Sequence, residues 1–317
     1  MQTPLTSINF SLSAACGASC IYCPSERGKA MATKNMPFAV ARKIIDEVNS
    51  PEFVEKYQVV KYVVGENGDS FINKEALDIL RYIKHRNPKA HIFCVTNFQQ
   101  LTPEKSATIL AEGLISSLCL NIDGSDPERY QAVKGLAYQE VLEEHFRTFL
   151  RIRESVQSPV PIHLSILSMH NYLQAVQNRF HRLPTQLRDA QATQWADDTE
   201  EVRARWAPLL RPGDVISRMR PMFWAERALV DKTTLDYSTY RCPLLKRIRS
   251  EAFIAPDGTW YACCFDDNYR LALGNVYQQS VDAVACSPAR EELIGQLEAQ
   301  AFARIGPPCD TVNCCWT

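Results

Sequence analysis

Three cysteines lie close together near the start of the sequence, where the segment AACGASCIYCP carries C-x3-C-x2-C spacing at Cys16, Cys20 and Cys23. Three closely spaced thiolates suit a [4Fe–4S] cluster in which one iron has no protein ligand. Such an iron can bind a small molecule through an amine and a carboxylate. The alternatives are a zinc site and a fortuitous triplet, although zinc ligands usually occur as C-x2-C pairs with a distant partner.

A second group of cysteines lies in the last 76 residues, which hold seven of the 12 in the chain. Cys242, Gly258 and Cys263 follow a C-x15-G-x4-C pattern, and a Pro-Asp-Gly turn should fold Cys263 back toward Cys242. The tail adds Cys309, Cys314 and Cys315. Four thiolates complete a closed iron–sulfur site, and a structural zinc site with four cysteine ligands has the same count.

Composition limits the classes of protein that remain. The 317 residues are 46% hydrophobic and 22% charged, with a net charge of −1, so a disordered chain is excluded and a nucleic-acid groove or an anionic membrane surface is not expected. Apolar runs are far shorter than the ~20 residues of a membrane span. The N-terminal sequence MQTPLTSINF is unlike a signal peptide. We therefore expect a cytoplasmic protein whose cysteines bind metal rather than form disulfides.

Apolar runs alternate with helical periodicity up to about residue 165, which predicts a parallel sheet covered by helices. The expected strands are Ser7–Leu12, Val59–Val64, His91–Thr96, Ser117–Ile122 and Ile162–Leu167. The expected helices are Pro37–Asn49, Lys74–Arg86, Pro103–Gly113 and Glu140–Ser155. A sixth unit should include Asp214–Phe223, after a helical insertion at about 170–213.

The alternation of strand-like and helical segments ends at about residue 236. Glu251–Ala255 and Thr259–Cys263 read as two short strands around the Pro-Asp-Gly turn, and a helix is expected from Ser287 to about Phe302. We therefore expect two domains, at residues 1–235 and 236–317. The irregular tail from Ile305 is a segment that metal ligands can order.

The first cysteine triplet, with the aromatic Tyr22 between its last two members, resembles that of the radical S-adenosylmethionine (radical SAM) superfamily. The resemblance implies a partial (β/α)6 TIM-type barrel, with S-adenosylmethionine on the cluster and Tyr22 near its adenine. Gly65 and Glu66 follow the second strand where the family has Gly-Gly-Glu, a motif whose backbone receives the methionine amino group. Here Val64 replaces the first glycine and Asn67 the usual proline.

Two further strand ends are similar to the family and add cofactor-binding candidates. Asn97 follows the third strand within a partial match to Thr-Asn-Gly, with Phe98 in place of the glycine. The fourth ends in Asn121-Ile122-Asp123-Gly124, close to Ser-x-Asp-Gly. The resemblance implies that Asn121 contacts the ribose or carboxylate of S-adenosylmethionine, and that Asp123 shapes the loop. In barrels of this kind chemistry occurs at the C-terminal ends of the strands.

The C-terminal pattern resembles the SPASM and twitch extensions of radical SAM enzymes, which are small α+β iron–sulfur domains. The single-cluster twitch form fits better, because the C-x2-C-x5-C-x3-C run of a full SPASM domain is missing. The resemblance implies an auxiliary [4Fe–4S] cluster held by Cys242, Cys263, Cys309 and Cys314, with Cys315 as the alternative to Cys314.

Other cysteines lie outside these ligand sets. Cys264 faces away from Cys263, and in similar peptide epimerases such a thiol donates a hydrogen atom to the substrate radical; buried packing is the alternative. Cys94, Cys119 and Cys286 are expected to pack in the core.

The resemblance implies that an external donor such as flavodoxin or ferredoxin reduces the first cluster, which cleaves S-adenosylmethionine to a 5′-deoxyadenosyl radical. That radical abstracts hydrogen from a peptide or small-molecule substrate, giving dehydrogenation, cross-linking or epimerisation. The first strand begins almost at once, which favours a small molecule or a short peptide. Two alternatives remain: an activating or maturase protein acting on a partner polypeptide, and a non-catalytic module stabilised by zinc.

Overall fold

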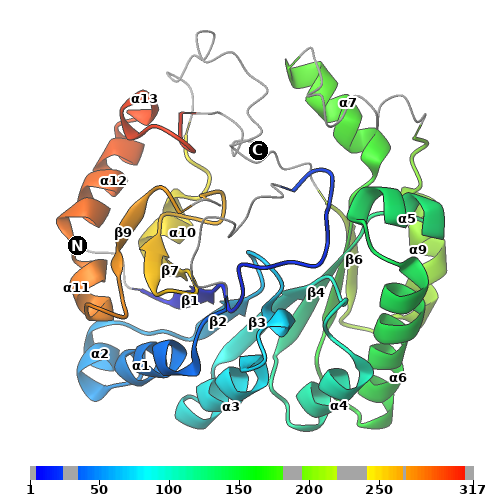
Figure 1. Cartoon of the computed structure of the whole chain (residues 1–317), viewed down its shortest axis with the longest axis horizontal. Helices are drawn as coiled ribbons and strands as arrows, with labels where there is room; N and C mark the ends of the chain where they lie inside the picture. The colour runs from blue at the N-terminus through cyan, green and yellow to red at the C-terminus, as the bar shows by residue number, and fades with distance from the viewer. Residues whose placement is uncertain (1–4, 24–34, 181–194, 220–240, 267–268, 311–317) are drawn as a thin grey trace. The chain divides into compact units, whose positions relative to one another are not determined.

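The computed structural model describes the chain except residues 1–4, 24–34, 181–194, 220–240, 267–268 and 311–317 (Figure 1). The chain divides into two compact units. The first comprises Met1–Cys16, Glu26–Phe93 and Trp224–Thr317, and the second comprises Gly17–Ser25 and Cys94–Phe223. The proposed domain boundary after residue 235 lies outside the described residues. No described helix is long and apolar enough to cross a membrane.

The sheet of the first unit has the strand order β2-β1-β7-β8-β9. Its strands are β1 (Ser7–Phe10), β2 (Lys61–Val64), β7 (Glu251–Ile254), β8 (Thr259–Tyr261) and β9 (Ala272–Asn275). β1 is parallel to both β2 and β7, whereas β7, β8 and β9 are antiparallel. All four residues of β1 are buried, as expected of a strand with neighbours on both sides and covered faces.

The expected hairpin forms as β7 and β8, with Phe253 opposite Tyr261. Gly258 has φ +86°, and the amide of Thr259 donates to the Asp257 carboxylate at 2.9 Å, so the Pro-Asp-Gly turn forms for the predicted reasons. The hairpin extends the sheet that begins with β1. The cysteine-rich segment therefore shares a sheet with the strand that precedes Cys16.

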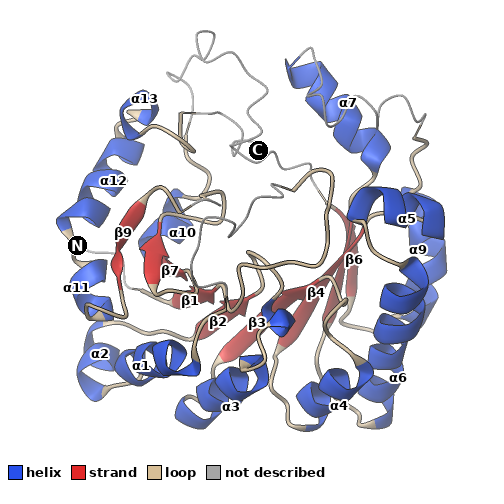
Figure 2. Cartoon of the chain, in the orientation of Figure 1, coloured by secondary structure: helices blue, strands red, loops and turns tan. Residues whose placement is uncertain are grey.

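Three helices of the first unit begin and end within a few residues of the predicted limits: α1 (Phe38–Val48), α3 (Ala76–Arg86) and α12 (Pro288–Glu298). The unit also contains α2 (Pro51–Lys56), α10 (Leu245–Ser250), α11 (Val281–Ala285), α13 (Phe302–Ile305) and a 3-10 turn η1 (Ser70–Ile72), for which no limits were predicted. α1 packs against α3, α2 and α11, and α12 packs against α10 (Figure 2). β3 (His91–Thr96) begins in this unit and ends in the second.

The second unit has three parallel strands in the order β4-β5-β6. They are β4 (Ser117–Ile122), β5 (Ile162–Ile166) and β6 (Val215–Arg218). β6 is the described part of the predicted Asp214–Phe223 unit. Its helices are α4 (Pro103–Ala111), α5 (Pro127–Lys134), η2 (Gln139–Phe146), α6 (Arg147–Ser155), α7 (Met169–Phe180), α9 (Thr199–Trp206) and the 3-10 turn η3 (Ala207–Leu209).

Two of these helices differ from expectation. The single helix predicted over Glu140–Ser155 is a π-helix, η2, followed by α6, because spacing of apolar residues does not separate a wide turn from a narrow one. α5 was not predicted, although its signals are present. Asp126 accepts from the amide of Arg129 as N-cap, Pro127 begins the helix, and Gly135 ends it at φ +67°.

Candidate functional site

The first cysteine triplet lies in the loop that follows β1. Cys16 is exposed, and Cys20 and Cys23 are half-buried. None of the ten described cysteines forms a disulfide. In the described part of the chain no three His, Cys, Asp or Glu side chains are grouped closely enough to hold a metal ion. Cys16 ends one unit and Cys20 belongs to the other, so ligation by all three stays a prediction.

The loop that carries Cys20 and Cys23 is fixed to the end of α5. The amide of Ser19 donates to the carbonyl of Lys134 at 2.9 Å, and that of Ile21 donates to Val133 at 3.0 Å. Gly135 is required at the contact, since a Cβ there would lie 2.0 Å from Ser19 Oγ. The loop is therefore held by backbone bonds that do not depend on a metal.

Tyr22 of this loop bonds to a buried ion pair formed by Asp123 and Lys134. The Tyr22 hydroxyl donates to Asp123 Oδ2 at 2.5 Å, and Lys134 Nζ lies 2.9 Å from the same oxygen. The side chains of Lys134 and Asp123 are only 4% and 0% exposed. Burial raises the pKa of Tyr22 well above its ordinary value, and Asp123 and Cys20 raise it further. Tyr22 therefore stays a neutral hydrogen-bond donor.

Lys134 carries a positive charge toward the cysteine loop. Burial lowers its pKa, but the negative charges of Asp123 and Cys20 raise it more, so the ammonium stays protonated. By the same interaction Lys134 favours the thiolate of Cys20, the form that binds iron. Asp123 Oδ1 is buried and has no hydrogen-bond partner among the described residues. The donor chemistry and the charge therefore fit a cluster held by this loop.

The residues at the end of β3 make local contacts. Asn97 Oδ1 accepts from the amide of Gln99 at 2.8 Å. Phe98 has φ +64° where the family has glycine, and it is fully buried, with ring centroids 5.0 Å from Phe146 and 5.4 Å from Phe149. The backbone therefore keeps the left-handed conformation of a glycine, and aromatic packing offsets its strain.

Asn121 is half-buried at the end of β4, and Asp123, which follows that strand, is 1% exposed. Their roles at the cofactor stay predictions. Cys94 is completely buried, as expected for a core residue, and burial raises the pKa of Cys119 to about 11, which disfavours its thiolate.

The segment after β2 lies against the residues that lead to Cys16. Gly65 has φ +91° and Gly68 has φ +74°, and a Cβ on Gly68 would lie 2.0 Å from the carbonyl oxygen of Ser13. The amide of Asp69 donates to the carbonyl of Ala15 at 2.8 Å. Asn67, in place of the family's proline, is 1% exposed and donates to the Tyr261 hydroxyl at 2.8 Å.

Glu66 faces an arginine from the cysteine-rich segment. Arg247 Nη2 donates to both carboxylate oxygens of Glu66, at 2.9 and 3.0 Å. The same guanidinium lies 2.8 Å from Glu251, and its Nη1 lies 3.7 Å from the sulfur of Cys264. Burial raises the pKa of Glu66 more than Arg247 lowers it. The sequence predicts no role for Arg247 or Lys134, because neither belongs to a recognisable motif.

The predicted auxiliary ligands are described in part. Cys242 is half-buried, with its pKa raised by burial, and Cys263 and Cys309 are buried. Cys314 and Cys315 lie outside the described residues. Their joint role as ligands stays a prediction.

Cys286, expected to pack in the core, instead ends α11 in a polar group. Its sulfur lies 3.4 Å from both Lys56 Nζ and the Tyr57 hydroxyl.

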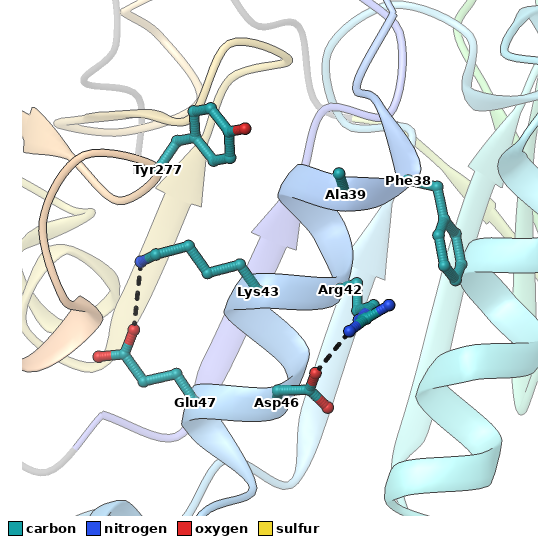
Figure 3. Close-up of a pocket in the computed structure, with 7 residues that line it drawn as sticks. All are labelled: Phe38, Ala39, Arg42, Lys43, Asp46, Glu47 and Tyr277. Carbon is teal, nitrogen blue, oxygen red and sulfur yellow. Dashed lines mark ion pairs between the residues drawn. The ribbon is translucent and has the colours of Figure 1, made fainter.

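A pocket of about 680 Å³ lies on the first unit, and none of the predicted cofactor residues lines it (Figure 3). It is lined by Phe38, Ala39, Arg42, Lys43, Asp46, Glu47 and Tyr277. Lys43 Nζ donates to the carbonyls of Val276 and Gln279 at 2.6 and 2.7 Å. These bonds tie α1 to the loop after β9, and no cysteine lines the pocket, so we assign it no chemistry.

Comparison with protein families supports the second cysteine group. Residues 242–315 match SPASM, an iron–sulfur cluster-binding domain. None of the curated proteins matches this sequence.

Several solved structures share the fold. BtrN, in complex with AdoMet (S-adenosylmethionine) and 2-DOIA, has 13% identity and a TM-score of 0.58 over 100% of this chain and 95% of BtrN. SuiB of Streptococcus suis, bound to the precursor peptide SuiA, has 12% identity and a TM-score of 0.57 over 93% of this chain and 67% of SuiB. anSMEcpe with bound AdoMet has 12% identity and a TM-score of 0.51 over 93% of this chain and 84% of that protein.

The chain therefore shares with BtrN, SuiB and anSMEcpe an α/β fold that has a mostly parallel sheet, and its C-terminal segment matches the model of the SPASM iron–sulfur cluster-binding domain.

Proposed function

We propose that the chain is a radical SAM enzyme in which Cys16, Cys20 and Cys23 hold a [4Fe–4S] cluster that binds S-adenosylmethionine. The observation that carries the proposal is the triplet on a loop fixed to α5 beside a buried ammonium, within this fold. When bound, the cluster and S-adenosylmethionine supply a 5′-deoxyadenosyl radical that takes a hydrogen atom from a substrate C–H bond.

The residues of the chain bind and orient this cofactor. Gly65 and Glu66 are proposed to receive the methionine ammonium group, since a carboxylate next to a positive-φ glycine offers both oxygen and carbonyl acceptors. Asn97 and Asn121 are proposed to bind its polar groups at the strand ends. Tyr22 is proposed to lie near the adenine. Asp123 acts by holding Tyr22 and Lys134 in place.

The C-terminal segment is proposed to hold an auxiliary [4Fe–4S] cluster through Cys242, Cys263, Cys309 and either Cys314 or Cys315. Its match to an iron–sulfur domain supports this, together with the buried positions of Cys263 and Cys309. An auxiliary cluster can accept an electron from the substrate radical, which gives a dehydrogenated or cross-linked product. A flavodoxin or ferredoxin is the proposed source of electrons, in the cytoplasm.

The substrate is proposed to be a peptide or a small molecule. SuiB was solved with a precursor peptide and anSMEcpe with the Cp18Cys peptide, whereas BtrN was solved with 2-DOIA. If the product is an epimer, Cys264 is the proposed hydrogen-atom donor. Its half-buried thiol lies beside Arg247 and its neighbour Cys263 is a proposed ligand.

Anaerobic purification with iron and sulfide counts tests the two clusters. We expect about eight irons per chain in the natural protein and about four after Cys16, Cys20 and Cys23 are all changed to Ala. The natural protein should form 5′-deoxyadenosine from S-adenosylmethionine and dithionite, and the triple variant should not. Colourless protein with zinc and no iron, or loaded protein that forms no 5′-deoxyadenosine, would overturn the proposal.

The role of Cys264 has its own test. In deuterated water Cys264→Ala should still form 5′-deoxyadenosine but lose deuterium incorporation into product, while Cys286→Ala should keep both. Unchanged deuterium in the Cys264 variant would remove it as donor.

A further inference from the structure

Arg247, to which the proposed function gives no role, is the centre of a polar cluster. The cluster consists of Asn9, Glu66, Arg247, Glu251 and Cys264, all in the first unit. Arg247 binds both oxygens of Glu66 and lies 2.8 Å from Glu251. It also donates to Asn9 Oδ1 at 3.3 Å, and its guanidinium lies over the ring of Phe253.

Three members of this cluster, Glu66, Arg247 and Cys264, come from segments that the proposed function uses or that flank its proposed ligands. Glu66 follows Gly65 in the segment proposed to receive the S-adenosylmethionine ammonium. Arg247 lies on α10, whose first amide, that of Leu245, donates to the carbonyl of Cys242 at 3.3 Å. Cys264 directly follows Cys263 in the hairpin. The Arg247 side chain therefore contacts Glu66 in the cofactor segment and Cys264 next to the proposed ligand Cys263, and its helix begins next to the proposed ligand Cys242.

The Glu66 carboxylate keeps acceptor positions for a second donor. Arg247 binds it directly, and Lys61 of β2 also acts on it as a nearby positive charge. Arg247 uses one face of the Glu66 carboxylate, and a carboxylate has about four acceptor positions. A primary ammonium group can therefore bind Glu66 while Arg247 holds it.

We propose that Arg247 is a positioning residue that orients Glu66 for the ammonium of S-adenosylmethionine and couples its binding to the order of the auxiliary-cluster segment. The proposal rests on the proposed function. The planar guanidinium binds Glu66 through Nη2 and Glu251 through Nε, so one rigid group holds two carboxylates at once, which the single ammonium of a lysine on its flexible stem does not do in the same geometry. Without Arg247 the Glu66 carboxylate is free to rotate, and a change in the position of Cys242 no longer alters the position of Glu66.

Equilibrium dialysis of S-adenosylmethionine against anaerobically loaded protein tests the positioning role. Arg247→Gln should weaken binding by about tenfold or more, and Arg247→Lys by less, with the iron count unchanged. Arg249→Gln is the matched control, since Arg249 lies on the same helix but pairs with exposed Glu298; it should bind within about twofold of the natural protein. Natural affinity in Arg247→Gln overturns the proposal, and so does weaker binding that comes only with lost iron or a lower melting temperature.

A double-mutant cycle tests the coupling. Cys242→Ala should lose the auxiliary cluster and weaken S-adenosylmethionine binding in the natural background, but add little in the Arg247→Gln background. Equal weakening in both backgrounds, or none in the natural one, overturns the coupling. Failure of the proposed function is distinguishable, because the natural protein itself would then hold no iron or bind no S-adenosylmethionine.

Discussion

The hydroxyl of Tyr22 donates a 2.5 Å hydrogen bond to Asp123, joining the second and third cysteines of the first triplet to the end of β4. The same carboxylate oxygen pairs with Lys134 at the end of α5. Two backbone bonds run from the loop to that helix end. The loop is therefore held by two backbone hydrogen bonds to the end of α5 and by the bond of Tyr22 to the buried Lys134–Asp123 ion pair.

Tyr22→Phe should destabilise the protein by about 1–3 kcal/mol, because it leaves a buried carboxylate with one donor fewer. Urea unfolding measures the change. Tyr130→Phe is the matched control, since the Tyr130 hydroxyl is buried and has no hydrogen-bond partner in the described part of the chain. Its removal should be neutral or slightly stabilising. Equal destabilisation by the two variants would contradict a stabilising role for the Tyr22–Asp123 bond.

Lys134→Met should be more harmful than Tyr22→Phe, at about 3–5 kcal/mol, because Asp123 would then be a buried charge without a cation. The double variant Lys134→Met with Asp123→Asn should recover part of this loss, since no charge is then left unpaired. Thermal unfolding followed by circular dichroism measures all three proteins. If the double variant is less stable than Lys134→Met alone, the ion pair does not explain the loss.

The strands and the first cysteine triplet could be predicted because their signals are local. His91–Thr96 and Ser117–Ile122 are buried apolar runs, and they form strands with the predicted limits. The two ion pairs of the site could not be predicted in this way. Glu66 and Arg247 are 181 positions apart, and only the pairing of β1 with β7 brings their segments together. Spacing along the chain contains no information about such a contact.

Phe98 shows a different limit of sequence reasoning. Positive φ is usually signalled by glycine, and Thr-Asn-Phe carries no such signal. The packing that keeps Phe98 at φ +64° comes from Phe146 and Phe149, which belong to helices far along the chain. The conformation is therefore set by tertiary contacts.

Phe98→Ala and Phe98→Gly should both lose about 3–5 kcal/mol of packing, but the glycine variant should be the more stable by about 1 kcal/mol, because it removes the left-handed strain. Phe149 provides the control, since it is equally buried but lies within α6. There glycine should be worse than alanine by about 1 kcal/mol. The order of stability should thus reverse between the two sites, and urea unfolding of the four variants checks this. The same order at both would rule out backbone strain at Phe98.

Ionised Asp214 should contribute to the free energy of unfolding, and this contribution should be lost at acid pH. It forms a two-pronged pair with Arg153, both bonds 2.8 Å, and their side chains are 1% and 3% exposed. Burial raises the pKa of Asp214, but the bonds from Arg153 and from the amides of Arg211 and Ile162 lower it more, so the folded pKa lies below the ordinary value. A carboxylate of this kind stabilises the fold above its unfolded pKa, near 3.9, and that contribution is lost as pH falls through the lower folded pKa.

Asp214→Asn should therefore cost about 3–5 kcal/mol at pH 7, because Arg153 becomes a buried charge without a partner. As pH falls below about 4, the natural protein should lose this advantage and the gap between the two should narrow. Melting temperatures across pH 7 to 3 measure the gap. Asp78→Asn serves as control, since Asp78 is 64% exposed in its pair with Arg81 and its variant should follow the natural curve. A gap for Asp214→Asn that stays constant down to pH 3 would show that its ionisation is not what stabilises this part of the fold.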